Sequence, residues 1–167
     1  MEKAAFKLVN YHFTKASLDF NIPKKANLNI SFNPKGVFKV QEAEYSLMCN
    51  VVIECEETSA KVVEVSYIAI FSFENKVMPN EIPDYFYANS LAIIFPYIRA
   101  FVSTITLQSN MHPIVLPTVN LMGLSEKLKR NTDVVASSPL PPPPTPPTPP
   151  HPPAPLPPPT TPPPLPA

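Results

Sequence analysis

Glycine and cysteine are scarce in this chain, and each scarcity excludes a class of protein. The 167 residues include only two glycines, Gly36 and Gly123, so the chain has no glycine-rich loop for a phosphate or nucleotide. Cys49 and Cys55 lie on one predicted strand, where their spacing places them about 20 Å apart, too far for a disulfide. Two free thiols without matching histidines make a poor zinc site and indicate a reducing compartment.

Excess charge and long apolar runs are also missing. The 13 Lys and Arg residues balance the 13 Asp and Glu residues, which gives no basic surface for nucleic acid or anionic lipid. The longest apolar run, residues 91–98, is too short to span a bilayer, and the N-terminus lacks the apolar stretch of a secretion signal. We therefore expect a cytoplasmic protein without membrane insertion.

Catalytic chemistry is not indicated either. The three histidines lie in a predicted strand (His12), before a proline (His112) and in the proline-rich C-terminal segment (His151), with no convergent set of partners. We expect no enzyme activity, no cofactor and no bound metal, and partners that are recognised through shape and apolar contact.

Alternating apolar residues predict a sheet in the first half of the chain. Residues 6–22 are extended, with a change of phase that predicts a bulge or break near Thr14 and Lys15. Residues 27–33 form a half-buried strand that the turn "NPKG" (33–36) is expected to end. Residues 37–56 and 61–73 then predict a long antiparallel hairpin.

The second face of that hairpin is apolar enough to need cover. We expect it to be buried against another copy of the chain, with Glu64 among the contacts. The alternative is a monomer with scattered exposed apolar residues. The other predicted interface residues are Met48, Val52, Val62, Ile68 and Ile70.

Helical patterns appear only after Pro79. A short helix is predicted over residues 83–94, and Pro96 is interpreted as the first residue of an amphipathic helix to about Ser109, or as a kink between two helical pieces. In that helix Arg99, Ser103 and Thr106 form the polar stripe. Residues 111–120 are apolar but irregular because they contain two prolines, and a short second helix follows around residues 121–130.

Residues 134–167 differ in composition from the domain predicted over residues 1–133. They are mostly proline, which predicts an extended, disordered tail in the polyproline II conformation. The tail could be a semi-rigid spacer or a ligand for an aromatic-lined groove. Alternatively, it is a solvated tail without a role or a segment not native to the domain.

Four segments in the same order and spacing resemble a known family. These are "FTKASLDF", "VVEVSYIAIFSF", "FPYIRA" and the run from Pro117 to Asn120, which has one residue more than the family pattern. Together they resemble the SecB protein-export chaperones and their SecB-like relatives, over about residues 6–128.

The resemblance implies an α+β fold, with a four-stranded antiparallel sheet and two C-terminal helices packed on one face. It also implies a homotetramer, a dimer of dimers, that holds unfolded polypeptides or preproteins in an apolar groove without catalysis. Each groove residue could equally be core. The groove residues expected here are Phe20, Ile22, Met111, Ile114, Val115, Leu116, Val119, Leu121 and Leu124.

The resemblance also names partners. Export chaperones of this family dock on the SecA motor through acidic residues, for which Glu64 and Asp19 are the candidates here. Ala16 stands where a further acidic residue is expected, and the acidic C-terminal tail of the family is missing. A dedicated chaperone for an antitoxin is therefore the first alternative, and a structural oligomer without clients is the second.

Overall fold

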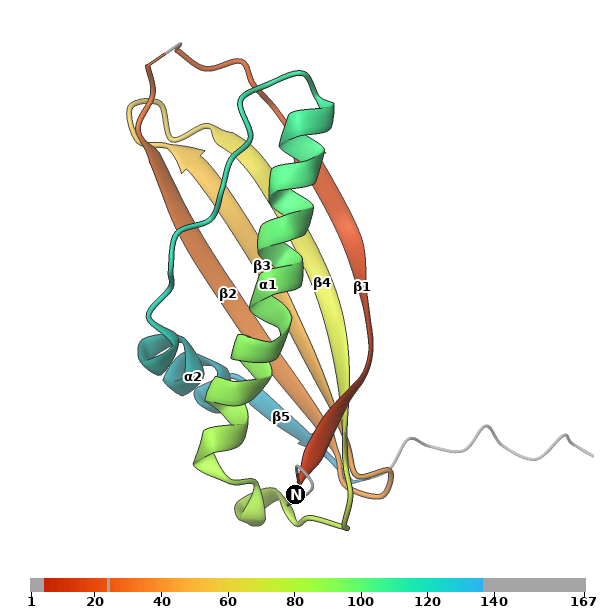
Figure 1. Ribbon diagram of the computed structural model, residues 1–167. Helices are drawn as coiled ribbons and strands as arrows, with labels where there is room; N and C mark the ends of the chain where they lie inside the picture. Colours follow the sequence, from red (N-terminus) through yellow and green to blue (C-terminus); the bar gives the residue numbers. More distant parts are fainter. Residues whose placement is uncertain (1–4, 24, 137–167) are drawn as a thin grey trace, which may run out of the picture.

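A computed structural model describes residues 5–23 and 25–136 of the chain. Its element order is β1 (Phe6–Leu18), β2 (Leu28–Lys39), β3 (Glu44–Cys55), β4 (Lys61–Phe73), a short 3-10 turn (Pro79–Glu81), α1 (Asp84–Gln108), α2 (Leu121–Arg130) and β5 (Thr132–Val135). The strands form one sheet in the order β1-β4-β3-β2-β5, and both helices lie on the same face of it (Figure 1). The predicted α+β layering is confirmed.

The sheet has five strands and is mixed, whereas four antiparallel strands were predicted. β1 to β4 are antiparallel as expected, but β5 adds to the outer edge of β2 in the parallel direction. The predicted domain boundary at residues 133 and 134 falls inside β5. The proline-rich tail lies outside the residues that the structure describes, so its predicted disorder stays a prediction.

The predicted turn at residues 33–36 is wrong, because β2 continues through it. Pro34 has no N–H to donate, but its nitrogen lies on the outer side of an edge segment, where no ladder hydrogen bond is lost. Gly36 is needed for space: a Cβ there would lie 1.8 Å from Tyr45 Oη. The actual turn follows at residues 40–43, and Ala43 adopts a left-handed φ of 49°.

The predicted bulge in β1 is confirmed. The β1–β4 register shifts between Phe13 and Lys15, and a second shift lies between Leu8 and Asn10. A third irregularity, between Ile53 and Glu54 in the β3–β4 ladder, was not predicted. It places both Val62 and Val63 in the core instead of on opposite faces.

One helix, α1, replaces the two predicted helical pieces. Pro96 lies inside it and is exposed, as is Ala92, whose carbonyl loses its usual N–H partner and can be solvated instead. The buried side of α1 repeats every three or four residues across the sheet, as in Leu91, Ile94, Ile98 and Val102. By length and mean hydropathy α1 could also cross a membrane, but its buried stripe explains the apolar composition.

Thr106 was predicted on the polar stripe of the helix and is fully buried instead. Its hydroxyl donates to a carbonyl one turn back, Val102 O at 2.8 Å, and accepts the Ile114 N–H at 2.9 Å. A buried polar side chain therefore fixes the loop that follows α1 onto the helix.

Candidate functional site

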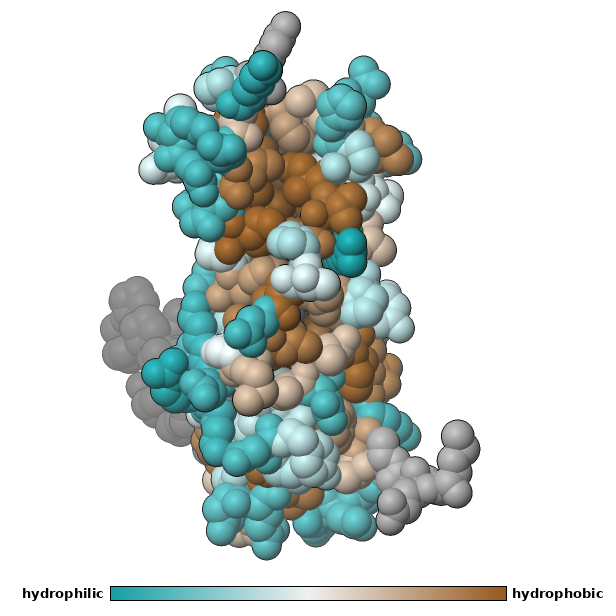
Figure 2. Space-filling model, turned by 60° about the vertical axis from the view of Figure 1, so that its left-hand side comes forward, coloured by the Kyte–Doolittle hydropathy of each residue, from teal (hydrophilic) through white to brown (hydrophobic). Residues whose placement is uncertain are grey.

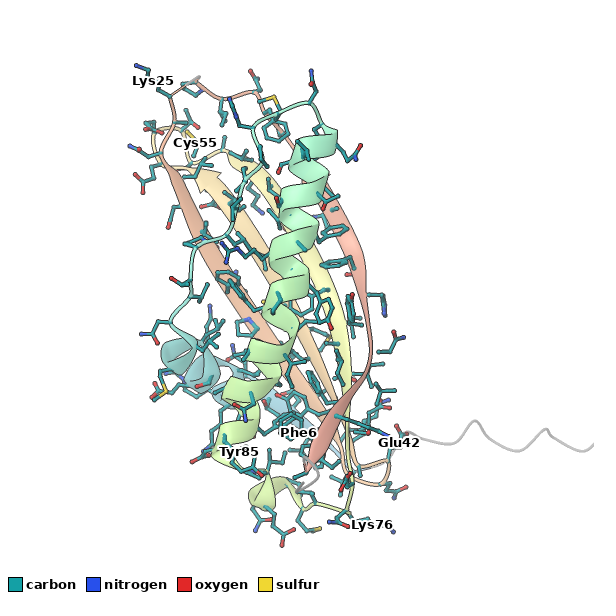
Figure 3. All side chains as sticks on the ribbon, viewed as in Figure 1. Phe6, Lys25, Glu42, Cys55, Lys76 and Tyr85 are labelled. Carbon is teal, nitrogen blue, oxygen red and sulfur yellow. The ribbon has the colours of Figure 1, made fainter. Side chains whose placement is uncertain are left out.

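An apolar pocket of about 510 Å³ opens at one end of the sheet. Its walls come from the segment after β1, the first residue of β2, the start of β4 and the loop after α1. It is at the end of the molecule that carries Lys25 and Cys55 (Figure 3). The pocket is lined by Phe20, Ile22, Pro23, Ala26, Leu28, Val62, Met111, His112, Pro113 and Ile114.

Hydrogen bonds from backbone N–H groups hold the two irregular walls of this pocket. Asp19 N–H donates to Val62 O at 2.9 Å, which ties the segment after β1 to β4. Asp19 Oδ1 accepts the Asn21 N–H at 2.9 Å and so shapes the turn before Ile22. On the other wall, Thr106 holds Ile114 as described above. Hydrogen bonds within the chain therefore hold both walls of the pocket in place.

The sequence-predicted groove residues fall into four groups, of which the buried Leu116 is the last. Phe20, Ile22, Met111 and Ile114 line the pocket together. Val115 is exposed (52%) on the loop beside it. Three half-buried residues, Val119, Leu121 and Leu124, lie farther along the chain, outside the pocket lining.

Leu116 is fully buried and belongs to the core. The Leu116 side chain therefore anchors the loop to the core and is not open to a ligand.

Hydrophobic residues gather on the side of the molecule that Figure 2 shows, most densely toward one end.

The uncovered face of the sheet carries the residues predicted for an oligomer interface. Met48, Ile68 and Ile70 are half-buried there, and Val52 is 5% exposed. Val62 must be taken out of this set, because the β3–β4 irregularity turns its side chain into the core and the pocket.

Glu64 lies on the same uncovered face within a polar cluster. Its carboxylate accepts from Lys15 Nζ at 2.7 Å and from Asn50 Nδ2 at 3.1 Å, and Lys61 lies 3.6 Å away. The hydrogen bond from Lys15, followed by that from Asn50, lowers the pKa of Glu64 below its usual value. Asp19, the other predicted SecA contact, is exposed at the pocket end of the sheet.

Cys49 is buried in the sheet and does not line the pocket. Burial raises the pKa of Cys49 to about 11, so its thiol is protonated at neutral pH. Among the residues that the structure describes, no group of His, Cys, Asp and Glu side chains could hold a metal ion. The pocket can bind through apolar contact and backbone hydrogen bonds.

A second pocket, of about 530 Å³, lies between the start of α1 and α2, at the end of the molecule that carries Tyr85 (Figure 3). An ion pair flanks it, with Lys129 Nζ 2.6 Å from Asp84 Oδ1, and Met122 is exposed on its rim. None of the predicted groove residues lines it.

The fold is that of a SecB-like chaperone. It matches the solved structure of a Mycobacterium tuberculosis SecB-like chaperone in complex with a ChAD peptide from an antitoxin, with a TM-score of 0.58 and 13% identity. The match covers 70% of this chain and 88% of that one. At this identity the likeness establishes the fold alone.

The family model for the preprotein translocase subunit SecB matches residues 12–131. The chain therefore belongs to the SecB family. Protein-export proteins SecB from Anaplasma phagocytophilum and Ehrlichia canis are 25% and 28% identical over 93 and 96 residues, 54% and 53% of this chain. An uncharacterized protein of Methanocaldococcus jannaschii is 46% identical over 41 residues, 25% of this chain.

The chain spans 26% of the M. jannaschii protein, 59% of the A. phagocytophilum protein and 54% of the E. canis protein. The family resemblance read from the sequence is confirmed by these matches.

Proposed function

We propose that the protein is a holdase, which binds extended apolar segments of non-native polypeptides and prevents their aggregation. The observation that carries this proposal is the apolar pocket beside a loop with exposed apolar side chains, Met111 (42%) and Val115 (52%). A folded protein gains no stability from such exposed side chains, whereas a chaperone uses them to contact many different sequences. Membership of the SecB family supports the same function.

The shape of the site suits a chain segment better than a small molecule. Nine of the ten residues that line the pocket have apolar side chains, and His112 is the exception. Methionine and irregular loop backbone allow different side chains to be packed. Binding of this kind requires no catalysis and no cofactor, and we expect it to take place in the cytoplasm.

The experiment is an aggregation assay with several unrelated denatured proteins as clients. We expect light scattering to fall as the protein is added in stoichiometric amounts. The doubly substituted variant Met111→Ser with Val115→Ser should protect less, because both changes remove exposed apolar surface. A matched control, Val134→Ser, removes an exposed apolar residue of β5 and should protect as well as the wild type. Lack of protection for every client would refute the holdase proposal.

A dedicated antitoxin chaperone is the second candidate. It is favoured by the structural neighbour, a SecB-like chaperone that was solved with an antitoxin peptide. This candidate predicts strong protection of one client encoded beside the chaperone gene and little protection of a general panel. The same assay, extended to that client, separates it from a general chaperone.

Protein export would add a SecA contact. The curated SecB relatives are export proteins, and Glu64 and Asp19 are the acidic residues available for such a contact. Glu64 is already bonded to Lys15 and Asn50, so SecA would have to compete with these partners. Binding of purified SecA, compared between the wild type and Glu64→Gln with Asp19→Asn, tests this role.

Assembly into a homotetramer through the uncovered sheet face is proposed with the corrected residue set. Met48, Val52, Ile68 and Ile70 supply the apolar part of that face, and Glu64 its polar part. Light scattering in solution measures the mass, and Ile68→Lys with Ile70→Lys should shift it toward smaller species. A monomeric wild type would refute the interface.

A further inference from the structure

The second pocket, between α1 and α2, is lined by tyrosine and methionine side chains. Tyr85 and Tyr87 come from the first turn of α1, and Met122 comes from the first turn of α2. Tyr85 is 53% exposed and Met122 is 70% exposed, although both side chains are largely apolar. The pocket is therefore a second apolar surface, separate from the one proposed for clients.

The polar groups of this pocket suit an uncharged ligand. Tyr87 is only 6% exposed, and its hydroxyl has no hydrogen-bond partner among the described residues. Because no buried polar side-chain atom of these residues lacks a partner, the Tyr87 hydroxyl must be accessible, and it can donate to a ligand carbonyl. Asp84 and Lys129 form an ion pair at 2.6 Å, so their charges largely cancel.

The C-terminal segment of the chain, which lies outside the described residues, has the composition of such a ligand. Residues 145–153 read "TPPTPPHPP", three repeats of one residue followed by two prolines. Polyproline II has three residues per turn, so in that conformation the prolines would form two continuous apolar edges. Its carbonyls make no internal hydrogen bonds, and residues 137–167 contain no Lys, Arg, Asp or Glu. Aromatic-lined grooves recognise segments of this kind.

The C-terminal segment begins at the end of the molecule that carries the second pocket. β5 runs parallel to β2 and ends beside Lys39, just before the turn that contains Glu42. Figure 3 shows Glu42 and Tyr85 toward the same end of the molecule. The apolar pocket proposed for clients lies at the other end and contains no tyrosine.

The segment is long enough to return to the second pocket. Lys129 lines the pocket, and Ala136 is the seventh residue after it, so the two lie within about 25 Å of each other. Polyproline II rises about 3.1 Å per residue, so about eight residues, 137–144, cover that distance. Residues 145–153 are the first that reach the pocket in every case.

Tethering favours this segment over one from another protein. A segment on a short flexible link has an effective concentration on the order of millimolar. A free-peptide Kd of about 0.1 mM, which is weak binding, would therefore give roughly 90% occupancy in the intact chain.

We propose that residues 145–153 dock in the second pocket of the same chain as a polyproline II helix. The proline edges pack against Tyr85 and Met122, and a backbone carbonyl accepts from the Tyr87 hydroxyl. The docked segment covers side chains that α1 and α2 leave exposed and joins the two helices at this end. The inference is independent of the holdase function and gives the proline-rich segment a role within the molecule.

A spin label in the full chain tests the docking. His151→Cys supplies a thiol for a nitroxide, and labelling is selective because Cys49 and Cys55 are buried. The probes are ¹³C-labelled methionine methyl groups, with Met122 in the second pocket and Met111 in the apolar pocket. The nitroxide broadens the NMR signals of methyl groups near it. We expect the Met122 signal to lose most of its intensity and the Met111 signal to keep it.

A change in the tail separates docking from the mere proximity of a tethered segment. Replacing the six prolines of residues 145–153 with serine keeps the length and the label position but removes the apolar edges. The Met122 signal should then recover. This variant leaves all the described residues unchanged, so its result does not depend on the folding of a substituted domain.

Changes in the pocket provide the matching test. Tyr85→Ala should also restore the Met122 signal, whereas Tyr97→Ala, at an exposed tyrosine of α1 outside the pocket, should not. Circular dichroism checks the fold of Tyr85→Ala, because Tyr85 stacks on Phe6 with ring centroids 6.5 Å apart. If this variant does not fold, the serine variant decides.

Three results would overturn the proposal. Equal broadening of Met122 in the serine variant would mean that tethering alone explains the effect. An unbroadened Met122 signal with the natural prolines would leave the segment free for an aromatic-lined groove of another protein. In a mixture of ¹³C-labelled chains without nitroxide and unlabelled chains with it, broadening of Met122 would show docking on a second copy. An unchanged Met122 signal in that mixture supports docking within one chain.

Discussion

Tyr45 Oη lies 2.7 Å from Thr132 Oγ1, and this hydrogen bond joins the centre of the sheet to its last strand. The Tyr45 hydroxyl passes over Gly36 to reach Thr132, and Thr132 Oγ1 in turn lies 2.8 Å from Leu128 O of α2. Burial raises the pKa of Tyr45, so the hydroxyl remains a neutral hydrogen-bonding group. One buried polar contact therefore fixes β5 against both β2 and α2.

Thr132→Val should lower the free energy of unfolding by about 1–3 kcal/mol, because a buried tyrosine hydroxyl loses its partner. Tyr45→Phe removes the other side of the same bond. In the double variant the two losses should not add, since the second change removes the unpaired group. Urea denaturation of the four proteins measures this coupling, and strictly additive losses would show that the bond contributes nothing.

The two glycines should respond in opposite directions to alanine. At Gly36 a methyl group would overlap Tyr45 Oη and approach Thr132 Oγ1 to 2.7 Å, so Gly36→Ala should destabilise by about 1–3 kcal/mol. Gly123 lies in α2 with nothing within 4 Å of the added carbon, so Gly123→Ala should stabilise by up to about 1 kcal/mol. The pair is compared by urea denaturation, and equal shifts would contradict the packing described.

Pro96→Ala should stabilise the protein by up to about 3 kcal/mol. The substitution restores an N–H inside α1, and the exposed proline ring makes little packing contact that could be lost. The melting temperature should rise, with client protection unchanged because Pro96 does not line the pocket. A fall in the melting temperature would mean that the proline supports the path of the helix across the sheet.

Glu64 should contribute to stability above its ordinary pKa and lose that contribution in acid. The Lys15 and Asn50 hydrogen bonds hold the folded-state pKa below 4.5, so the folded protein releases this proton more readily than the unfolded chain. The contribution is present at neutral pH and disappears as the pH falls through the folded-state pKa. We expect Glu64→Gln to be less stable than wild type at pH 7 and nearly equal at pH 2. A pH-independent difference would contradict this origin.

Two neighbouring loop residues should separate binding from stability. Val115 is 52% exposed, so Val115→Ser should weaken client protection and leave the melting temperature unchanged. Leu116 is fully buried, so Leu116→Ala should lower the free energy of unfolding by about 2–5 kcal/mol. Thermal melts and the aggregation assay are run on both variants. The same effect from both substitutions would argue against the loop geometry.

Sequence patterns predicted the antiparallel strands and α2 because these depend on local alternation and spacing. The side chains of β3 and β4 repeat with period two over most of their length, except near the irregularity at Val62, and Leu121, Leu124 and Leu128 mark one face of α2. Pro34 and Pro96 misled the prediction. At Pro34 the nitrogen lies outside the β2–β3 ladder, and at Pro96 the carbonyl that loses its donor, Ala92 O, belongs to an exposed residue, so neither element ends at its proline.

The parts that could not be predicted depend on contacts between distant segments. β5 has four residues and directly follows a helix, so its pairing with Gly36 to Lys39 leaves no periodic signal. Val62 enters the core through a register shift that involves the partner strand. Thr106 appears polar in the helix, and only the position of Ile114 explains its burial. For the pocket, four of nine predicted residues were brought together.

The parallel direction of β5 determines where a tether can be attached. Leu28 and Lys39 lie at opposite ends of β2, which at about 3.3 Å per residue is roughly 36 Å long. An affinity handle joined after Val135 would therefore hold the molecule by the end far from the pocket. On a sensor surface loaded in this way, the binding end faces the solution, and clients can approach it without crossing the support.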